Sequence, residues 1–500
     1  MNRLTKKQMW IFAIGQLGWS ILGGIINAWL VAFYLINDKT HDGGVKFLIP
    51  SGLVIGGFLT VLGLITALCR VWDAVTDPMV ANLSDNSKNK KGRRLPFMRF
   101  AAIPFAIITV LVFLAPVENA EASGNYAANI AWVAIFLVLF YTFMTIYCTP
   151  YNALISEFGK TQEDRMNIST YISLTYFAGT LLAYTPFVFG GLLQGSLGYY
   201  WSYRVCFIVL AIIACVCMLL PTFLLKETDF VEAKPAGTNA FESLGKTFKN
   251  KDFRVFTASD IMYWIGLTLF QTGLPFFVTV SMKLADSYTM IFMGAMTVLS
   301  ACFYPVVNGL VKKFGKKKLT IAGFFGLALA YLITAICSIT QKDLKDANVL
   351  SYVYGVLICI VAALPMALLG IIPQSIVADV AEKDSIESHE NREGMFFAAR
   401  TFAMKLGQSI AMLAFTSLAI LGTTQDVTKN DISANPTGLM IVAIVAVVFC
   451  CLGAVILMFY NEKKVMKAIA KESDKEYLAA ENLDEDLNSE EITTQEVDKE

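Results

Sequence analysis

Long apolar runs, separated by short polar stretches, fill nearly the whole chain. A run of about twenty apolar residues crosses the roughly 30 Å hydrocarbon core of a bilayer as a helix. The pattern therefore predicts an all-α membrane protein with twelve transmembrane helices. We expect them over residues 9–36, 47–82 (long, and broken or tilted), 96–116, 128–155, 167–193, 201–225, 254–281, 286–311, 318–340, 350–381, 394–421 and 437–460. The first run is too long for a signal-peptide core and stays as the first helix.

Polar segments divide the chain into parts. The stretch 226–253 is polar and predicts a cytoplasmic linker between two six-helix bundles, at 1–225 and 254–460. The remaining part, 461–500, is an acidic cytoplasmic tail, with eleven acidic residues and two lysines from Asp474 to Glu500. That composition cannot build a core, so we expect the tail to be mostly disordered.

Basic loops indicate the orientation. The densest clusters are NKKGRR at 89–94 and KKFGKKK at 312–318, and further basic residues flank the first and last helices. All of them fall on one side if the chain has twelve helices, which places both termini in the cytoplasm of a multi-pass cell-membrane protein. Both dense clusters also follow the second helix of a half. This favours parallel repeats with a site between the halves, although any positive-inside protein carries basic loops here.

The amino-acid composition argues against other classes of protein. The chain is 56% hydrophobic and 16% charged, against roughly 25% charged residues in soluble proteins. A net charge of zero gives no argument for a nucleic-acid partner. The ten cysteines lie mostly in apolar runs without metal-ligand spacing, and the two histidines fall in predicted loops. We find no nucleophile–base pair and no metal cluster, so we predict neither an enzyme nor a cofactor.

Charges inside apolar runs carry the functional signal, because each costs about 2.5–3.5 kcal/mol at a helix centre. Asp73 and Asp77 stand four residues apart, so both carboxylates project from one helix face. Two such charges repel unless a cation or proton neutralises them, which is the requirement for a sodium, lithium or proton site. The alternative is a helix cap or a surface pair at the cytoplasmic end. Lys405 lies in the 394–421 run, where it either snorkels to the cytoplasm or provides their counter-charge.

Three segments together resemble a known family. They are RVWDAVTDPMVANLSDNSKNKKGRRLPFM from Arg70, then PYNAL from Pro150 leading to Glu157 and Arg165, then ADV from Ala378 leading to EG and KLG. This combination is similar to the glycoside–pentoside–hexuronide cation symporters, the melibiose-permease branch of the major facilitator superfamily. The resemblance implies cation-coupled symport of a sugar, glycoside or sugar derivative by alternating access, with a small-molecule solute, the lipid bilayer as surroundings, and a monomeric state.

Residue by residue, the resemblance assigns a cation site. Asp73 and Asp77 match the family's cation-binding carboxylates and would hold Na⁺ in a sodium-coupled protein. Thr145 matches a further oxygen ligand, and Lys405 a lysine implicated in coupling. Thr76, also placed in the cation site, stands where the melibiose-permease branch has asparagine, so both Na⁺ and H⁺ remain open as the coupling ion.

The resemblance fails in the sugar pocket. The two pocket carboxylates of the melibiose-permease branch fall at Ser20 and Cys148, its tryptophan at Asn152 and its arginine at Ser173. Galactoside specificity is therefore not expected, and a lipid-like or sulfonated solute, or a transport-inactive sensor, are the alternatives. The candidate solute-binding residues are Trp19, Ser20, Asn27, Cys148, Asn152 and Tyr171, with Trp29, Tyr176 and Gln271 as further polar or aromatic candidates. The candidate cytoplasmic gate residues are Arg165, Asp379 and Glu393.

Overall fold

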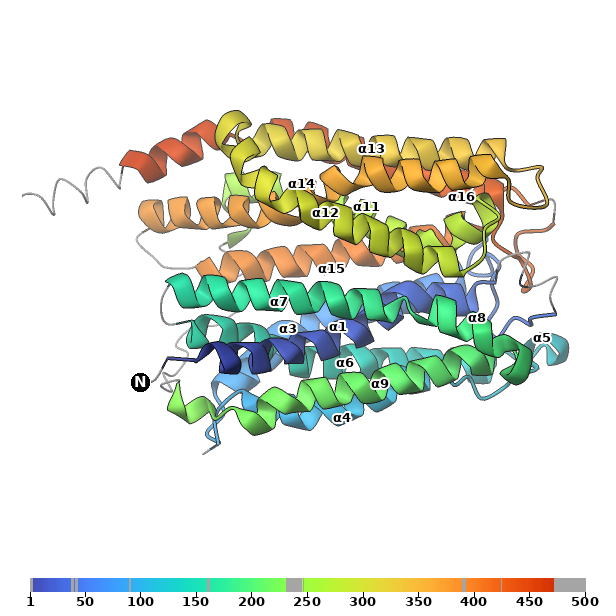
Figure 1. Ribbon diagram of the computed structural model, residues 1–500, viewed down its shortest axis with the longest axis horizontal. Helices are drawn as coiled ribbons and strands as arrows, with labels where there is room; N and C mark the ends of the chain where they lie inside the picture. Colours follow the sequence, from blue (N-terminus) through green and yellow to red (C-terminus); the bar gives the residue numbers. More distant parts are fainter. Residues whose placement is uncertain are drawn as a thin grey trace, which may run out of the picture.

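A computed structural model describes residues 3–36, 40, 44–89, 91–159, 162–230, 245, 247–388, 393–423 and 425–471. Its helices run roughly parallel in one elongated bundle, and residues 3–5 lie at the same end as residues 461–471 (Figure 1). We call this the terminal end and the other the opposite end. The predicted tail beyond residue 471 and most of the predicted linker, 231–244, lie outside the described residues.

Ten of the described helical spans are long and apolar enough to cross a membrane. They are α1 (Lys6–Tyr34), α4 (Leu95–Val112), α6 (Ala127–Phe158), α7 with α8 (Gln162–Ala183 and Pro186–Leu197), α9 (Tyr199–Leu224), α11 with a π-helical end (Lys251–Phe276 and Phe277–Ser281), α12 (Ser287–Phe314), α13 (Lys316–Thr340), α14 (Val349–Ser388) and α16 (Pro436–Met458). Two further long helices, α3 (Val61–Asp85) and α15 (Glu393–Leu418), contain charged residues and bring the described helices to the predicted twelve spans. A short helix, α5 (Ala120–Ser123), and a 3₁₀ turn, Glu227–Asp229, lie in connections.

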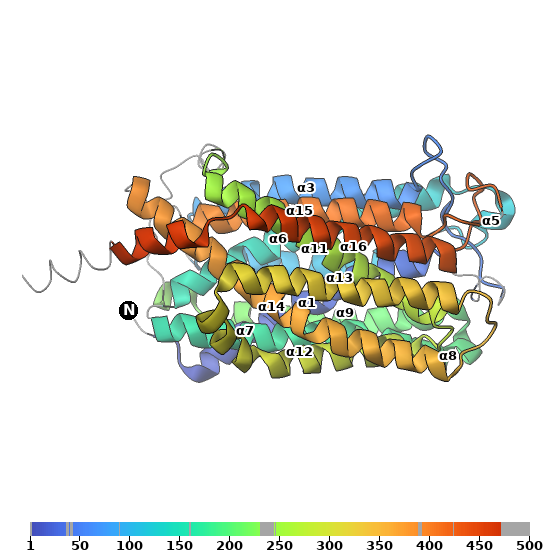
Figure 2. The ribbon, with the colours of Figure 1, turned by 90° about the horizontal axis from the view of Figure 1, so that it is seen from above.

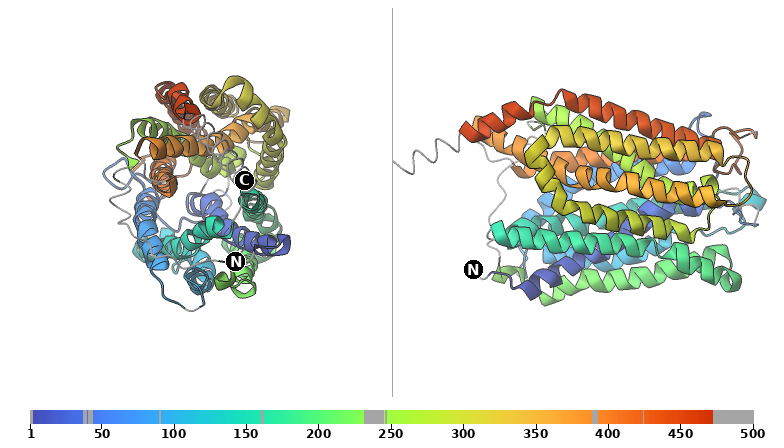
Figure 3. Two further views of the ribbon diagram at one scale, coloured as in Figure 1. Left: turned by 90° about the vertical axis from the view of Figure 1, so that its left-hand side faces the viewer. Right: turned by 45° about the horizontal axis from the view of Figure 1, so that its top comes forward.

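The helices pack in two groups. In the first, α1 packs on α7 and α9, and α6 packs on α3 and α4; in the second, α13 packs on α14 and α16, and α11 packs on α15 and α16. Contacts between the groups run mainly along α3 with α15, and also join α1 to α11 and α8 to α12. The view along the bundle shows the helices surrounding a central axis (Figure 3). The helices α3 and α15, which carry charged residues within their apolar runs, therefore lie at the interface between the groups.

The predicted helix at 47–82 is wrong in its first part. Residues 47–60 form a non-helical segment, and α3 begins only at Val61, after Thr60 accepts a hydrogen bond from the Gly63 amide at 3.1 Å. Gly56 and Gly57 adopt positive φ angles of 63° and 76°, which favour glycine and end a helix. The 167–193 run also divides, because Pro186 starts α8 after the turn that ends α7.

The 47–60 segment joins the two groups at the opposite end, where Figure 2 draws it beside the connection that precedes α16. The Ser51 amide donates to the Asn430 carbonyl at 3.0 Å, and the Leu53 amide donates to the Val427 carbonyl at 2.7 Å. The Ser51 hydroxyl also donates to the Ile432 carbonyl at 2.6 Å. We call residues 47–60 the strap. It adds backbone hydrogen bonds between the halves that do not depend on side-chain identity.

Candidate functional site

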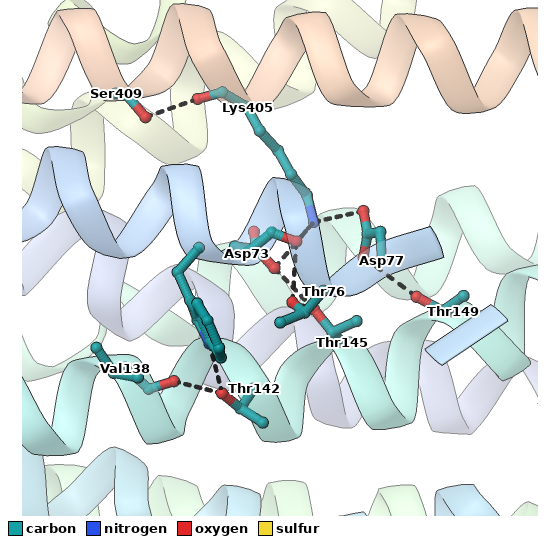
Figure 4. A network of polar contacts seen from close by, with 10 residues as sticks. Asp73, Thr76, Asp77, Val138, Thr142, Thr145, Thr149, Lys405 and Ser409 are labelled. Atoms are coloured by element: carbon teal, nitrogen blue, oxygen red, sulfur yellow. Dashed lines mark hydrogen bonds and ion pairs between the residues drawn. The ribbon is translucent and has the colours of Figure 1, made fainter. Parts of the chain in front are cut away.

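A largely buried ion-pair cluster links α3 to α15 (Figure 4). Lys405 Nζ lies 2.9 Å from Asp73 Oδ1 and 2.6 Å from Asp77 Oδ2. The side chain of Asp73 is 0% exposed and that of Lys405 is 8% exposed. The four-residue spacing on α3 directs both carboxylates to one face, as expected, and α15 supplies the lysine from across the interface. Lys405 therefore does not snorkel to the terminal end but bridges both carboxylates.

Two threonines of α6 support the carboxylates from the other side. Thr145 Oγ1 donates to Asp73 Oδ1 at 2.8 Å, and Thr149 Oγ1 donates to Asp77 Oδ1 at 3.2 Å. Thr145 was a sequence prediction, whereas Thr149 was missed. Its signal was available, because residues four apart on a helix share a face. Thr76 donates to the Asp73 backbone carbonyl at 3.0 Å, so its hydroxyl lies at the cluster's edge.

The oxygen atoms of this cluster fit a monovalent cation. Two carboxylates and one ammonium sum to one net negative charge, so one further positive charge would neutralise the cluster. Asp73 Oδ2 is buried and has no hydrogen-bond partner within the described part of the chain. Leaving a buried carboxylate oxygen unpaired is costly, and a hard cation prefers carboxylate and hydroxyl oxygens as ligands. Asp73, Asp77 and Thr145 together offer such a set.

A cavity of about 310 Å³ adjoins the cluster between the two groups. Asp77, Thr145 and Lys405 form part of its wall. Five of the six candidate solute-binding residues line it, together with two of the further candidates: Trp19, Ser20, Asn27, Cys148, Asn152, Tyr176 and Gln271. The structure therefore brings the predicted solute and cation residues together at one place.

Other predicted residues lie elsewhere. Tyr171 is absent from the cavity wall and stacks on Trp10 with a centroid distance of 4.5 Å. Trp29 is buried against Phe187 and donates its indole hydrogen to the Ala183 carbonyl at 3.1 Å, so it packs α1 on its neighbours. Both aromatic rings pack against other side chains of the protein. The expectation that they contact solute is therefore not supported by their positions.

The gate candidates are only partly described. Asp379 of α14 forms an ion pair with Lys316, at 2.5 Å, at the start of α13 near the terminal end. This pair lies within the second group of helices rather than between the groups. The side chains of Arg165 and Glu393 lie outside the described residues. Their assignment to a gate stays a prediction.

Two intramembrane arginines were missed from the sequence. Arg70 lines the cavity and stands three residues before Asp73 on α3, the helix that carries the carboxylates. Arg400 of α15 forms a bidentate pair with the buried Asp260 of α11, at 2.8 and 3.0 Å. The available signal was the charge itself, since an ionisable residue in a membrane helix needs a partner or a function. Spacing alone does not join Arg400 to a residue on another helix.

Two packed groups of membrane helices, with charges and a cavity at their interface, define a multi-pass membrane transporter. The chain belongs to the family described as MFS/sugar transport protein, which matches residues 11–463. This confirms the predicted major facilitator fold and the resemblance to its cation symporters.

Similar proteins agree on transport but differ in their solutes. The chain is 25% identical over 452 residues to the uncharacterized symporter YjmB of Bacillus subtilis (strain 168), covering 84% of each. It is 23% identical over 508 residues to the sodium-dependent lysophosphatidylcholine symporter 1 of Xenopus tropicalis, covering 91% of this chain and 87% of that one. The crystal structure of a D-xylose-proton symporter shares the fold, with a TM-score of 0.63, 14% identity, and coverage of 91% and 98%.

Proposed function

We propose that this protein is a cation-coupled symporter that moves a sugar, glycoside or sugar derivative by alternating access. The single observation that carries the proposal is the carboxylate–threonine–lysine cluster, which forms part of the wall of the cavity between the two helix groups. The cluster carries one excess negative charge, and its buried Asp73 Oδ2 has no hydrogen-bond partner among the described residues. A cation bound there therefore changes the electrostatic environment of a solute in the same cavity.

Ion exchange at Lys405 provides a route for coupling. In the described state the ammonium contacts both carboxylates, which lie on the other helix group. A cation that binds Asp73, Asp77 and Thr145 weakens the hold of the lysine on α3, because it shares the same oxygens. The halves can then move relative to each other with the solute between them. By linkage, solute raises cation affinity by the same factor by which the cation raises solute affinity.

The orientation follows from the basic loops, and we place the terminal end in the cytoplasm of a cell-membrane protein. The strap then lies on the extracellular side. Its hydrogen bonds from Ser51 and Leu53 to the second half hold this side closed, so they must break before the cavity opens outward. Opening and closing of the strap, in alternation with the cytoplasmic side, is the movement that alternating access requires.

A second candidate is a non-sugar solute, either lipid-like or sulfonated. The sodium-dependent lysophosphatidylcholine symporter 1 of Xenopus tropicalis covers 91% of this chain. The cavity wall carries Ser20 and Cys148 at the positions where the melibiose-permease branch has sugar-binding carboxylates. Without these two carboxylates, hydrogen bonding to sugar hydroxyls is weaker and an anion is not repelled.

Ion binding tests the proposal without knowledge of the solute. Tryptophan fluorescence reports on the site, because Trp19 and Trp264 line the cavity and Trp72 stands next to Asp73 in the sequence. Purified protein is titrated with NaCl, LiCl or choline chloride, and separately with acid. We expect a saturable change with Na⁺, Li⁺ or H⁺ that Asp73→Asn abolishes. Asp343→Asn, in an exposed loop, is the matched control.

Uptake into proteoliposomes then tests symport. A radiolabelled glycoside panel is offered with an inward sodium gradient, an inward proton gradient, or no gradient. Gradient-driven accumulation that Asp73→Asn removes supports the proposal. An ion response that is unchanged in Asp73→Asn refutes the cation site, and uptake that is equal with and without every gradient refutes coupling.

A further inference from the structure

A second cavity lies away from the interface between the helix groups, where α4 begins and α9 ends. These two helices pack side by side in the first group (Figure 1). The cavity has a volume of about 630 Å³, and the charged residues of its wall in the described part of the chain are Lys91, Arg99 and Lys226, all of them basic. None of the three forms an ion pair with a described residue. The wall therefore carries three positive charges that no described carboxylate neutralises.

The two lysines are open to a ligand from outside the bundle. Lys91 lies in the loop before α4, Lys226 follows α9, and both are exposed. Arg99 is half-buried, because its guanidinium donates to the Thr222 carbonyl and lies 4.2 Å from the centre of the Phe223 ring. A carbonyl and a ring solvate this charge but do not neutralise it.

The neighbouring acids do not line this cavity. Glu227 is 2% exposed, and its carboxylate accepts hydrogen bonds from three successive amides at the start of α4, those of residues 93–95, at 2.8, 2.9 and 2.9 Å. Asp229 is exposed but absent from the wall. Because Glu227 already satisfies the amides and the positive end of the α4 dipole, the charge available to a ligand comes from the basic side chains.

An apolar groove follows along the same two helices. A cavity of about 290 Å³ begins one turn further along α4, at Ile103, and its wall consists of aliphatic residues and Cys215. It follows α4 as far as Leu111, about 12 Å at about 1.5 Å per residue, which approaches half of the roughly 30 Å hydrocarbon core. Phe100 and Phe223, in the wall of the basic cavity, are 66% and 63% exposed. A positively charged end and an apolar length thus lie in one line.

We propose that the α4–α9 surface binds one phospholipid of net negative charge. Its phosphate lies at Lys91, Arg99 and Lys226, and an acyl chain lies in the apolar groove. Basic pockets between membrane helices suit anionic headgroups, and a soluble phosphate would leave the groove unused. Since α4 and α9 belong to the same group of helices, this lipid can stay bound while the two groups move. With the terminal end in the cytoplasm, it belongs to the cytoplasmic leaflet.

Native mass spectrometry of the purified protein in detergent tests the site. The protein is titrated with palmitoyl-oleoyl phosphatidylglycerol and with the phosphatidylcholine that carries the same chains, so that the two lipids differ in net charge. We expect the first phosphatidylglycerol to bind about tenfold more tightly, and equal affinities overturn the inference. Glycerophosphoglycerol, the same headgroup without chains, should not displace the lipid. Displacement at equal concentration would indicate a site for soluble phosphates and also overturns the inference.

Charge variants test the basic wall. Each basic residue near a membrane surface strengthens the attraction of an anionic lipid about fivefold. Lys91→Gln combined with Lys226→Gln should therefore remove most of the preference for phosphatidylglycerol and leave the affinity for phosphatidylcholine unchanged. Lys312→Gln combined with Lys313→Gln, at the exposed end of α12, removes the same charge from the other group of helices and is the matched control. An unchanged preference in the first variant, or an equal loss in both, overturns the inference.

A bulky residue in the groove tests the position of the acyl chain. Ile107 lines the groove and is 54% exposed, so Ile107→Trp adds volume there without disturbing the buried core. It should weaken phosphatidylglycerol at least about fivefold, the worth of one or two buried methylene groups. Ile135→Trp on α6, where the isoleucine is 57% exposed, is the matched control. An unchanged lipid affinity in Ile107→Trp overturns the choice of a lipid as the ligand.

Discussion

Replacement of Lys405 by methionine separates the lysine's structural role from its proposed competition with a cation. The wild-type ammonium lies 2.9 Å from Asp73 and 2.6 Å from Asp77, and Asp73 has no exposed surface. Removing one partner of a buried ion pair costs about 3–5 kcal/mol, because the other charge stays buried and unpaired. Here the methionine variant leaves two carboxylates on one helix face without an ion-pair partner among the described residues. We therefore expect a marked loss of stability when no binding cation is present.

Sodium should offset much of that loss. A ligand present at about 100 times its dissociation constant stabilises the folded state by about 2.7 kcal/mol. Without the lysine the site loses one positive charge, so the variant should bind sodium more tightly than wild type. The assay is thermal unfolding in detergent, in NaCl and in choline chloride of equal ionic strength. We expect a larger sodium-dependent rise in melting temperature for Lys405→Met than for wild type.

A second buried pair provides the control. Lys383 of α14 pairs with Asp252 of α11 away from the cavity, and the lysine side chain is 4% exposed. Lys383→Met should destabilise the protein without changing the difference between NaCl and choline chloride. The competition mechanism is refuted if the melting temperature of Lys405→Met is the same in NaCl and in choline chloride. The carboxylates would then not bind sodium when the lysine is absent.

Three further predictions follow from the site and the strap. Thr149→Val should weaken cation binding up to about tenfold by removing one hydrogen bond to a carboxylate, measured by the fluorescence titration; unchanged affinity would contradict its role. Gly52→Ala should open the opposite end, because a Cβ there would lie 1.8 Å from the Lys429 carbonyl oxygen. A cysteine introduced by Ser20→Cys should therefore react faster with an impermeant maleimide when Gly52→Ala is also present. An unchanged reaction rate would contradict the proposed role of the strap. Tyr171→Ala should leave solute affinity unchanged in titration, since it does not line the cavity.

Hydrophobic patterning predicted most of the fold, because a membrane span depends on length and apolarity alone. It failed at 47–60, where the residues are apolar but Pro50 and the glycines at 56 and 57 prevent a helix. An apolar strap that packs between two halves has the same composition as a membrane span. Its contacts with the second half, more than 370 positions away, could not be predicted from the local sequence.

Some parts of the site could be predicted from the sequence and others could not. The four-residue spacing of the two aspartates gave their shared face, whereas Lys405 lies 328 positions from Asp77 and no local pattern joins them. The family resemblance supplied that connection as an expectation, and the geometry agrees with it. Arg70 was passed over because it stands beside two more familiar charges. In the described structure its guanidinium contacts Asn27 and the Tyr141 ring rather than a carboxylate. Which residues it contacts is decided by the packing of the cavity, which the sequence alone does not give.

The positions of α3 and α15 follow from what their charges cost. Each intramembrane charge costs about 2.5–3.5 kcal/mol at a helix centre, so a helix with several of them cannot face lipid on that side. Packing α3 against α15 lets the carboxylates of one half and the lysine of the other neutralise each other. The interaction that permits both helices to enter the membrane is therefore also a bond between the halves. A cation that replaces the lysine satisfies the carboxylates while releasing this bond, and ion occupancy is in that way tied to the relative movement of the halves.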